Sequence, residues 1–246
     1  MFFESRGNTS EVPNSDAGTL EGWVNVYLQA NAGALLPGMV HNHQNAVHSL
    51  AMQTELLLTS FNSSKTPKAL NRLTSLSRNL IQAYEHLGKR QVFTQKTPTQ
   101  VNMELFAHWL HDYWTNDLFL KHHVQLEITV SQECPQTLHL CPYHLTLCFE
   151  EALKNAVEGC FDKGSQERHQ IQLTILPNAS GVSVTIASPT RLEQDCDPFA
   201  PYSTTKPDHL GLGLALVRHC CASAGWSSAL TPHNGQALFR LDIPMA

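Results

Sequence analysis

Apolar residues recur at helical spacing between Leu20 and Asn62, and the chain before them is polar and rich in Ser, Asn and Gly. The pattern predicts a flexible segment over residues 1–19 and then a long first helix, kinked near Pro37 and Gly38. Steps of mostly three and four place one apolar seam on this helix, formed by Val40, Val47, Ala51, Thr54, Leu58 and Phe61. A seam of this kind needs a partner surface to cover it.

A second helix is predicted over residues 68–87, because Thr66 and Pro67 suit its first turn and Gly88 suits its end. Its seam alternates steps of four and three and consists of Ala69, Leu73, Leu76, Leu80, Ala83 and Leu87. One antiparallel hairpin cannot cover both of its own stripes, whereas two hairpins can pair into a four-helix bundle. The pattern therefore predicts a homodimer through a helical domain over residues 20–90. The alternative is a hairpin that packs on its own C-terminal half.

The remainder of the chain, residues 91–246, mixes helical and strand patterns and is predicted to form a second domain. Helices are predicted over residues 101–118, 143–164 and 210–224. Alternating apolar residues predict strands over residues 124–130, 169–177, 181–188, 227–233 and 235–244. The predicted fold class is α+β: a helical hairpin that forms a dimeric four-helix bundle, followed by a two-layer α/β sandwich.

Composition narrows the possible functions. The 246 residues are 42% hydrophobic and only 15% charged, as in a folded globular protein. The net charge is −5 and no basic stripe is present, so nucleic acid is not an expected partner. No apolar run is long enough to span a membrane, and the first residues contain no apolar signal core. The seven cysteines lack metal-type CxxC spacing, so we expect reduced thiols in a cytoplasmic protein.

Three polar side chains share one stripe of the first helix, away from its apolar seam. His41, Asn45 and His48 follow one another at steps of four and three, so they point the same way. An exposed imidazole is a good nucleophile near neutral pH, which makes His41 a candidate nucleophile. The same pattern also suits a simple solvated face. A metal site from His41, His43 and His48 is disfavoured, because His43 points elsewhere and no Cys or carboxylate joins them.

Two patterns in the C-terminal half suit a nucleotide. Glu151 and Asn155 lie one helical turn apart, and an amide oxygen such as that of Asn155 is a suitable ligand for Mg²⁺. The polar loop before the last helix contains two glycines, so the backbone can approach phosphate oxygens closely at a helix N-terminus. The candidate phosphate-binding residues of this loop are Thr204, Thr205, Lys206, Gly211, Leu212, Gly213 and Leu214.

The chain resembles the catalytic module of two-component sensor histidine kinases over roughly residues 35–244. Four stretches, in the order of that family, are similar to its phospho-acceptor helix, N box, F box and second glycine box: MVHNHQNAVHSL (39–50), FEEALKNAVEG (149–159), DPFAPYSTTKP (197–207) and HLGLGLALVRHCCASAGW (209–226). The stretch GQALFRLDIP resembles the closing strand of the family's sandwich. The resemblance implies a sandwich of the histidine kinase ATPase type.

The resemblance also implies roles for individual residues. His41 would be the phospho-accepting histidine, Asn155 the Mg²⁺-binding asparagine with Glu151 as its companion acid, and Phe199 the F-box aromatic. The glycine-containing loop resembles the lid over the ATP phosphates. The expected cofactors are therefore ATP and Mg²⁺, and the expected partner is a response-regulator receiver domain. Asn45 matches the position where related proteins place a residue that orients water for dephosphorylation of that partner.

Two features depart from the family pattern. The adenine-binding D-x-G-x-G box should follow the strand VSVTIA, but the chain continues as SPTRLEQ (188–194). Loss of a buried, charge-assisted hydrogen bond costs about 1.5–3 kcal/mol, or about tenfold to a hundredfold in affinity. The acid that normally follows the histidine is Asn42 here, and general-base assistance is worth roughly 10²–10⁴-fold in rate. Both departures affect ATP-dependent autophosphorylation, and neither affects acceptance of phosphate from another protein.

Three functions therefore remain open. The first is a histidine kinase that binds ATP through a degenerate catalytic domain. The second is an ATP-independent histidine phosphotransferase or phosphatase that relays phosphate through His41. The third is a non-enzymatic dimeric adaptor for a receiver domain. The intact lid sequence favours the first function slightly, because a simple relay has no need for that loop.

Overall fold

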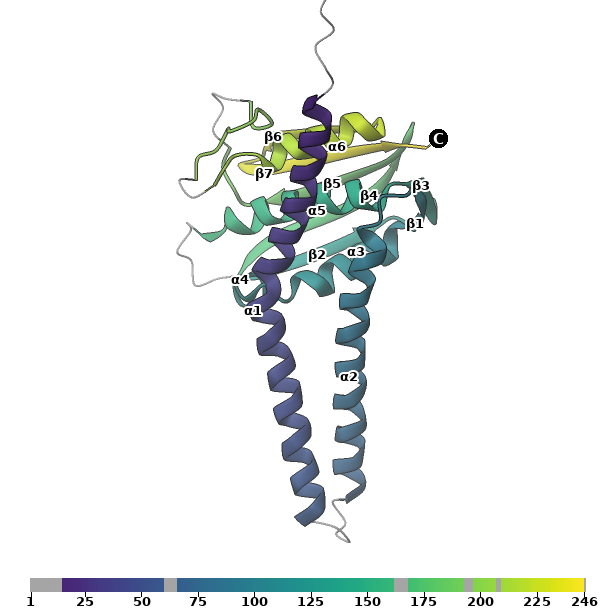
Figure 1. Cartoon of the computed structure of the whole chain (residues 1–246), viewed down its shortest axis with the longest axis vertical. Helices are drawn as coiled ribbons and strands as arrows, with labels where there is room; N and C mark the ends of the chain where they lie inside the picture. Colours follow the sequence, from purple (N-terminus) through teal and green to yellow (C-terminus); the bar gives the residue numbers. More distant parts are fainter. Residues whose placement is uncertain (1–14, 60–65, 162–167, 193–196, 207–208, 246) are drawn as a thin grey trace, which may run out of the picture.

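A hairpin of two long helices, α1 (Ser15–Thr59) and α2 (Thr66–Phe93), extends from a sandwich of helices and strands (Figure 1). The computed structural model describes residues 15–59, 66–161, 168–192, 197–206 and 209–245. The elements of the sandwich are β1 (Thr99–Asn102), α3 (Met103–Trp114), α4 (Leu118–His123), β2 (Val124–Val130), β3 (Thr137–Leu140), α5 (Pro142–Glu158), β4 (His169–Asn178), β5 (Gly181–Ser188), α6 (Gly213–Ala224), β6 (Ser227–His233) and β7 (Gln236–Pro244).

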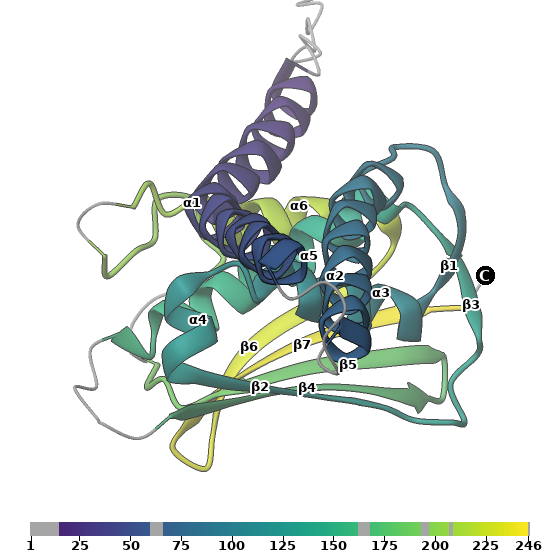
Figure 2. The ribbon, with the colours of Figure 1, turned by 90° about the horizontal axis from the view of Figure 1, so that it is seen from below.

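The main sheet has five strands in the order β2-β4-β5-β7-β6. β2 and β4 pair in parallel, and the other neighbours pair antiparallel. Strands β1 and β3 form a separate antiparallel pair that joins Thr99 to Leu140. Helices cover one face of the main sheet (Figure 2). The predicted α+β sandwich is therefore present, and the predicted main-sheet strands all form.

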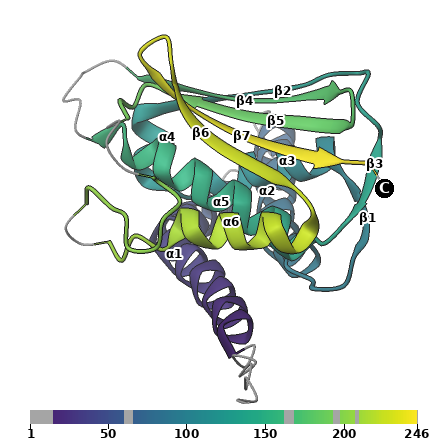
Figure 3. The same ribbon diagram turned by 90° about the horizontal axis from the view of Figure 1, so that it is seen from above.

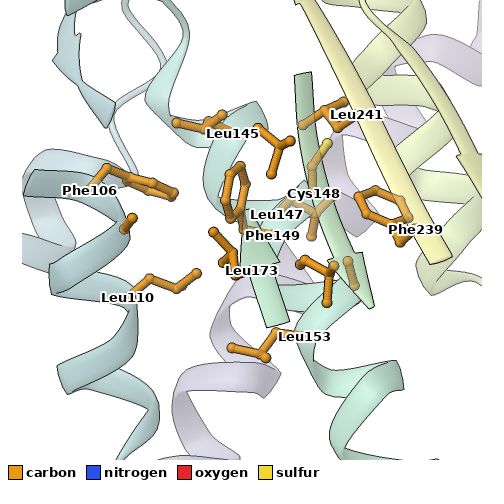
Figure 4. Packing of buried hydrophobic residues seen from close by; sticks show 14 of the residues in the cluster. Phe106, Leu110, Leu145, Leu147, Cys148, Phe149, Leu153, Leu173, Phe239 and Leu241 are labelled. Atoms are coloured by element: carbon orange, nitrogen blue, oxygen red, sulfur yellow. The ribbon is translucent and has the colours of Figure 1, made fainter. Parts of the chain in front are cut away.

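The core lies between this sheet and helices α3 and α5. Every second residue of β4 points inward, and Ile171, Leu173 and Ile175 are fully buried. From the helical side, the rings of Phe106 and Phe149 meet edge to face with centroids 5.0 Å apart. Figure 4 shows Phe106, Phe149 and Leu173 packed between α3, α5 and the strands. This core holds one face of α5, the helix that contains the predicted Mg²⁺ ligand.

The N-terminal half of α1 forms an outer layer on α5 and α6 (Figure 3). Val24, Leu28, Leu35 and Met39 are buried in this contact. Packing of the hairpin on its own C-terminal half, the alternative raised by the sequence, is thus what the single chain does along this part of α1. Helix α1 already begins at Ser15, so residues 15–19 are helical, and the rest of the predicted flexible segment lies outside the described residues.

The part of the hairpin that extends beyond the sandwich, residues 40–59 and 66–87, leaves much apolar surface uncovered. The α2 seam predicted from the sequence is half-buried throughout and lies beside α1. On α1, by contrast, Val40, Val47 and Leu58 are 46%, 52% and 75% exposed. Phe61 of the predicted seam lies outside the described residues. The single chain therefore does not cover the α1 seam.

Helix α2 does not end at Gly88 as predicted but continues to Phe93. The residues beyond the glycine make strong tertiary contacts. Arg90 donates to Glu150 and to the backbone oxygen of Leu28, and the Phe93 ring packs 4.7 Å from that of Trp109. These contacts outweigh the modest helix penalty of one glycine.

Two predicted helices have different bounds in the structure. The predicted helix over residues 101–118 is a strand followed by two helices, because Asn102 and Asp117 each accept a backbone N–H three residues ahead and start a new helix. The predicted helix over residues 143–164 ends at Glu158, followed by Gly159 at its C-cap. The predicted end at Gly164 lies outside the described residues.

Gly33 and Gly38 are a matched pair for testing how closely α1 approaches the sandwich. A Cβ at Gly38 would overlap the backbone oxygen of Asn116, whereas a Cβ at Gly33 would have no atom within 4 Å. We expect Gly33→Ala to raise the free energy of unfolding by about 0.5–1 kcal/mol through helix propensity. Gly38→Ala should lower it by about 1–3 kcal/mol through overpacking. Urea unfolding measures both values, and a gain in stability at Gly38 would contradict the close approach.

Candidate functional site

A cavity of about 610 Å³ lies between α1, α5, the loop before α6 and the ends of the central strands. It brings together most of the nucleotide-binding residues predicted from the sequence. Those that line it are Glu151, Asn155, Thr204, Thr205, Lys206, Gly211, Gly213 and Leu214. Leu212 is the exception, since its side chain is buried and does not line the cavity. Segments that are far apart in the chain thus meet around one space.

Helix α5 contributes the acidic wall of the cavity. Glu151 is only 3% exposed, and burial raises the pKa of its carboxyl, an effect that the charge of Lys154 partly offsets. Asn155, one turn later, is half-buried and faces the cavity. A Cβ at Gly213 would overlap the Glu151 carboxylate. A side chain at residue 213 would therefore require the buried Glu151 carboxylate to move.

The loop before α6 contributes the cationic wall. Lys206 forms an ion pair with Glu158 on the last turn of α5, and His209 Nε2 lies 3.7 Å from the same carboxylate. Thr204 stabilises the loop, because its hydroxyl accepts the backbone N–H of Lys206 at 3.1 Å. Gly211 adopts a φ of +65°, and a Cβ there would also overlap the backbone at Tyr202 and Ser203. Glycine is thus required at this position.

The end of β5 carries hydroxyl groups where the resemblance predicts an aspartate. Ser188 is buried, and its hydroxyl donates to Thr190 Oγ1 at 3.1 Å. Thr190 in turn lies so close to Gly159 that a Cβ at this glycine would overlap its side chain. Arg191 also lines the cavity. The described residues at the end of β5, 188–192, offer hydroxyls and a guanidinium and contribute no carboxylate.

Phe199, the predicted F-box aromatic, anchors the start of the loop. It is 5% exposed, and the guanidinium of Arg218 on α6 lies over its ring at 5.0 Å. Arg218 also donates two hydrogen bonds of 2.8 Å to Asp197, which lower the pKa of this carboxyl. The phenyl ring thus packs under Arg218 at the start of the loop and does not line the cavity.

His41 lies outside this cavity, on the exposed face of α1. Its Nε2 is 3.0 Å from the side-chain nitrogen of Asn45 one turn later, as the shared stripe predicts. His48 is exposed on the same helix, whereas the His43 ring packs 4.8 Å from that of Tyr84. Among the residues that the structure describes, no three His, Cys, Asp or Glu side chains form a group able to hold a metal ion.

Comparison with known proteins gives matches by structure only. No protein-family model and no curated protein matches this chain. The catalytic domain of the histidine kinase ThkA matches with a TM-score of 0.52 at 17% identity, over 60% of this chain and 95% of that domain. Full-length ShkA in complex with AMPPNP matches with a TM-score of 0.53 at 17% identity, over 94% of this chain and 46% of ShkA. The fold is that of a histidine kinase.

Within the histidine kinase fold, Asn42 stands where the resemblance leads one to expect an acid. Its amide donates to Asn116 Oδ1 at 3.0 Å, and its oxygen accepts from Lys121 Nζ at 2.6 Å. An aspartate could accept from Lys121 but could not donate to Asn116. Asn42 therefore ties the hairpin to the sandwich, next to a second cavity of about 250 Å³.

Sequence reasoning missed a buried polar cluster beside the site. Glu150 is fully buried and accepts from Arg90, and Asn31 of α1 donates to both Glu150 and Glu151. One sequence feature does indicate Asn31. It is the single polar residue in the buried α1 stripe Val24, Leu28, Asn31, Leu35 and Met39, which has helical spacing. A buried amide within such a stripe needs polar partners on the facing element.

The residues of the cavity fit a magnesium nucleotide at its phosphate end. Mg²⁺ usually takes one or two protein oxygens and completes its shell with phosphates and water, so Asn155 and Glu151 suffice. Lys206 and the two glycines suit phosphate oxygens. The end of the cavity where the adenine base would lie fits less well, because Ser188 and Thr190 stand in place of the expected carboxylate.

In the described part of the chain, the helices are too short or too polar to cross a membrane.

Proposed function

We propose that this chain is a phosphotransfer protein of two-component signalling. His41 carries a phosphoryl group and exchanges it with an aspartate of a response-regulator receiver domain. The observation that best supports this proposal is an exposed His41, bonded to Asn45, on a helix that packs against a sandwich with the histidine kinase fold. The imidazole is exposed and lies outside the cavity, so a partner protein can reach it.

The side chains on this face of α1 suit the chemistry. The Asn45 amide donates to Nε2 of His41 and so favours the tautomer with its proton on Nδ1. The Nε2 lone pair that accepts this hydrogen bond is also the one that would attack phosphorus, so the bond to Asn45 must break before attack. In transfer from a phosphoaspartate, an N–P bond forms as the P–O bond to the aspartate breaks, and the aspartate leaves as a carboxylate. In the opposite role, Asn45 can orient a water toward a receiver phosphate.

The cavity extends the proposal to nucleotides. Asn155 and Glu151 would hold Mg²⁺, and Lys206, Gly211 and Gly213 would surround the phosphates. Bound Mg-ATP would supply a γ-phosphoryl group for His41. ShkA, which shares the fold, was determined with AMPPNP bound. The lysine would then exchange its ion pair with Glu158 for a phosphate, which opens the loop as the ligand enters.

An ATP-independent phosphotransferase is the second candidate. The end of β5 supports it, since the described residues there place no carboxylate where the base would sit. Calorimetry with Mg-ATP separates the two candidates. Binding at sub-millimolar Kd supports the first. No binding at millimolar Mg-ATP, with transfer to His41 intact, leaves the second. If transfer fails as well, the chain is an adaptor for receiver domains.

Transfer itself is tested with a receiver domain that carries labelled phosphate on its aspartate. We expect the label to move to this chain and to be labile in acid but stable in base, as a phosphoramidate is. A label that is stable in acid, or no transfer from any receiver encoded alongside this chain, would contradict the proposal.

We further propose that the exposed seam of α1 is covered by a second copy of this chain in a four-helix bundle. Val40, Val47 and Leu58 are the apolar side chains that such a dimer would bury. Sedimentation velocity at micromolar concentration should give a dimer of about twice 27.4 kDa. A monomer across that range would exclude it.

A further inference from the structure

Residues 21–31 of α1, here called the docking segment, lie along the phosphate end of the cavity. Trp23, Val26, Tyr27 and Ala30 line this cavity together with Glu151 and Lys206. Figure 3 shows α1 on the outer side of α5 and α6, and Figure 1 shows it crossing them. The docking segment therefore contacts the two helices that would hold Mg²⁺ and phosphate.

Asn31 occupies polar groups of α5 that a ligand would use. Its amide donates to Glu151 Oε1 at 2.7 Å and lies 3.4 Å from Glu150 Oε2. Its oxygen accepts from Lys154 Nζ at 3.4 Å. The side chain is 3% exposed, so these bonds are shielded from water. The Asn31 side chain is thus hydrogen-bonded to both Glu151 and Lys154 of the cavity wall.

Tyr27 contacts the backbone at the start of α6. Its hydroxyl is hydrogen-bonded to the backbone of Leu212, and its ring lies 5.9 Å from the Lys154 ammonium. Burial and the charge of Glu151 raise the pKa of Tyr27, so its hydroxyl is neutral. The N–H groups at a helix N-terminus are the ones that a phosphate oxygen binds. Tyr27 therefore takes up a position that suits a phosphate.

We propose that the docking segment competes with a magnesium nucleotide, with Mg²⁺ for Glu151 and with the phosphates for Leu212 and Lys154, so that nucleotide binding and release of this segment are coupled. This inference rests on the nucleotide cavity of the proposed function. The coupling is reciprocal: nucleotide displaces the segment, and a tightly docked segment weakens nucleotide binding. Because α1 also carries His41, release of the segment frees the helix that must approach the nucleotide.

Asn31→Asp tests the competition, with Asn25→Asp as its control. Both variants make the same chemical change on one helix, but Asn25 is exposed whereas Asn31 faces two buried carboxylates. A carboxylate at 31 repels Glu150 and Glu151 and should undock the segment. We expect Asn31→Asp to bind Mg-AMPPNP about 5- to 100-fold more tightly than wild type by calorimetry. Asn25→Asp should match wild type, and Asn155→Ala should remove the binding.

Two further measurements keep the test independent of that substitution. Tyr27→Phe removes only the hydroxyl and should tighten binding by less than Asn31→Asp does. Hydrogen exchange of wild type should show faster exchange in residues 21–31 when Mg-AMPPNP is bound.

The outcomes separate this inference from the proposed function. Equal affinity in wild type and both segment variants, or weaker binding by Asn31→Asp, overturns the competition and leaves the nucleotide site standing. Slower exchange of residues 21–31 with nucleotide also overturns it. No binding by any variant overturns both the competition and the nucleotide site. Transfer from a phosphorylated receiver to His41 is measured without nucleotide and is judged separately.

Discussion

The His41→Gln variant should accept no phosphoryl group from a phosphorylated receiver domain. Glutamine keeps the polarity of the position, but its amide nitrogen has no available lone pair and cannot attack phosphorus. We expect the labelled phosphate on the chain to fall at least about a hundredfold, because the nucleophile itself is lost. The measurement is the amount of acid-labile label transferred from a receiver of the same organism. Since His41 is exposed, the variant should unfold at the same urea concentration as wild type.

His48→Gln is the matched control for this prediction. His48 is exposed on the same helix, two turns after His41. The His48→Gln variant keeps His41 and should therefore accept labelled phosphate at the wild-type rate. Equal loss of label in both variants would indicate that the face binds the receiver without carrying phosphate. Full transfer to His41→Gln would exclude His41 as the carrier.

Arg90→Ala should lower the free energy of unfolding more than Gly38→Ala does. The guanidinium ties α2 to three other helices, because it donates to Glu150 of α5 and to the Leu28 oxygen of α1 and lies 4.8 Å from the Tyr113 ring of α3. Glu150 is 0% exposed, so removal of Arg90 leaves a buried carboxylate without its cation. Breaking one partner of such a pair costs about 3–5 kcal/mol. Urea unfolding at neutral pH measures this loss.

Two variants control this measurement. Arg78→Ala removes an exposed arginine from the same helix and should cost less than about 0.5 kcal/mol. The double variant Arg90→Ala, Glu150→Gln removes the unpaired charge and should recover part of the loss. A cost at Arg90 no larger than at Arg78 would show that the ion pair contributes little.

The same cluster predicts a pH dependence. Burial raises the pKa of Glu150, and the Arg90 hydrogen bond and charge partly lower it again. Without Arg90 the pKa of this carboxyl in the folded state rises further. A raised carboxyl pKa gives stability that is present below the unfolded pKa and is lost as pH rises through the folded pKa. The deficit of Arg90→Ala should therefore be larger at about pH 8 than at about pH 5.

Several elements could be predicted from the sequence with close bounds. Strands β2 and β5 begin and end where the alternating pattern does, because one face of each is buried and the period of two is local. Strands β1 and β3 were missed, since each has four residues and pairs with a partner 35 to 41 residues away. Asn102 and Asp117 were also missed as caps, although both are common N-cap residues.

Some features of the candidate site could likewise be predicted from the sequence, and others could not. The ordered stretches around His41, Asn155 and Gly211 could be recognised in sequence because each is a short local pattern. The role of Asn42 could not, since its partners Asn116 and Lys121 are 74 and 79 residues away. The sequence indicated only that Asn42 replaces an acid able to act as a general base. In the structure, Asn42 joins the helical hairpin to the sandwich.

The sequence by itself determined the helical hairpin, the α/β sandwich and the likeness to histidine kinases, because periodicity and short motifs depend on neighbouring residues. Only the tertiary structure decided that the first half of α1 packs on the cavity, through contacts such as Asn31 with Glu151, 120 residues later. It also decided that α2 continues past Gly88 to bring Arg90 to Glu150. Such contacts depend on how layers meet in space, and the local pattern of either partner does not specify the other.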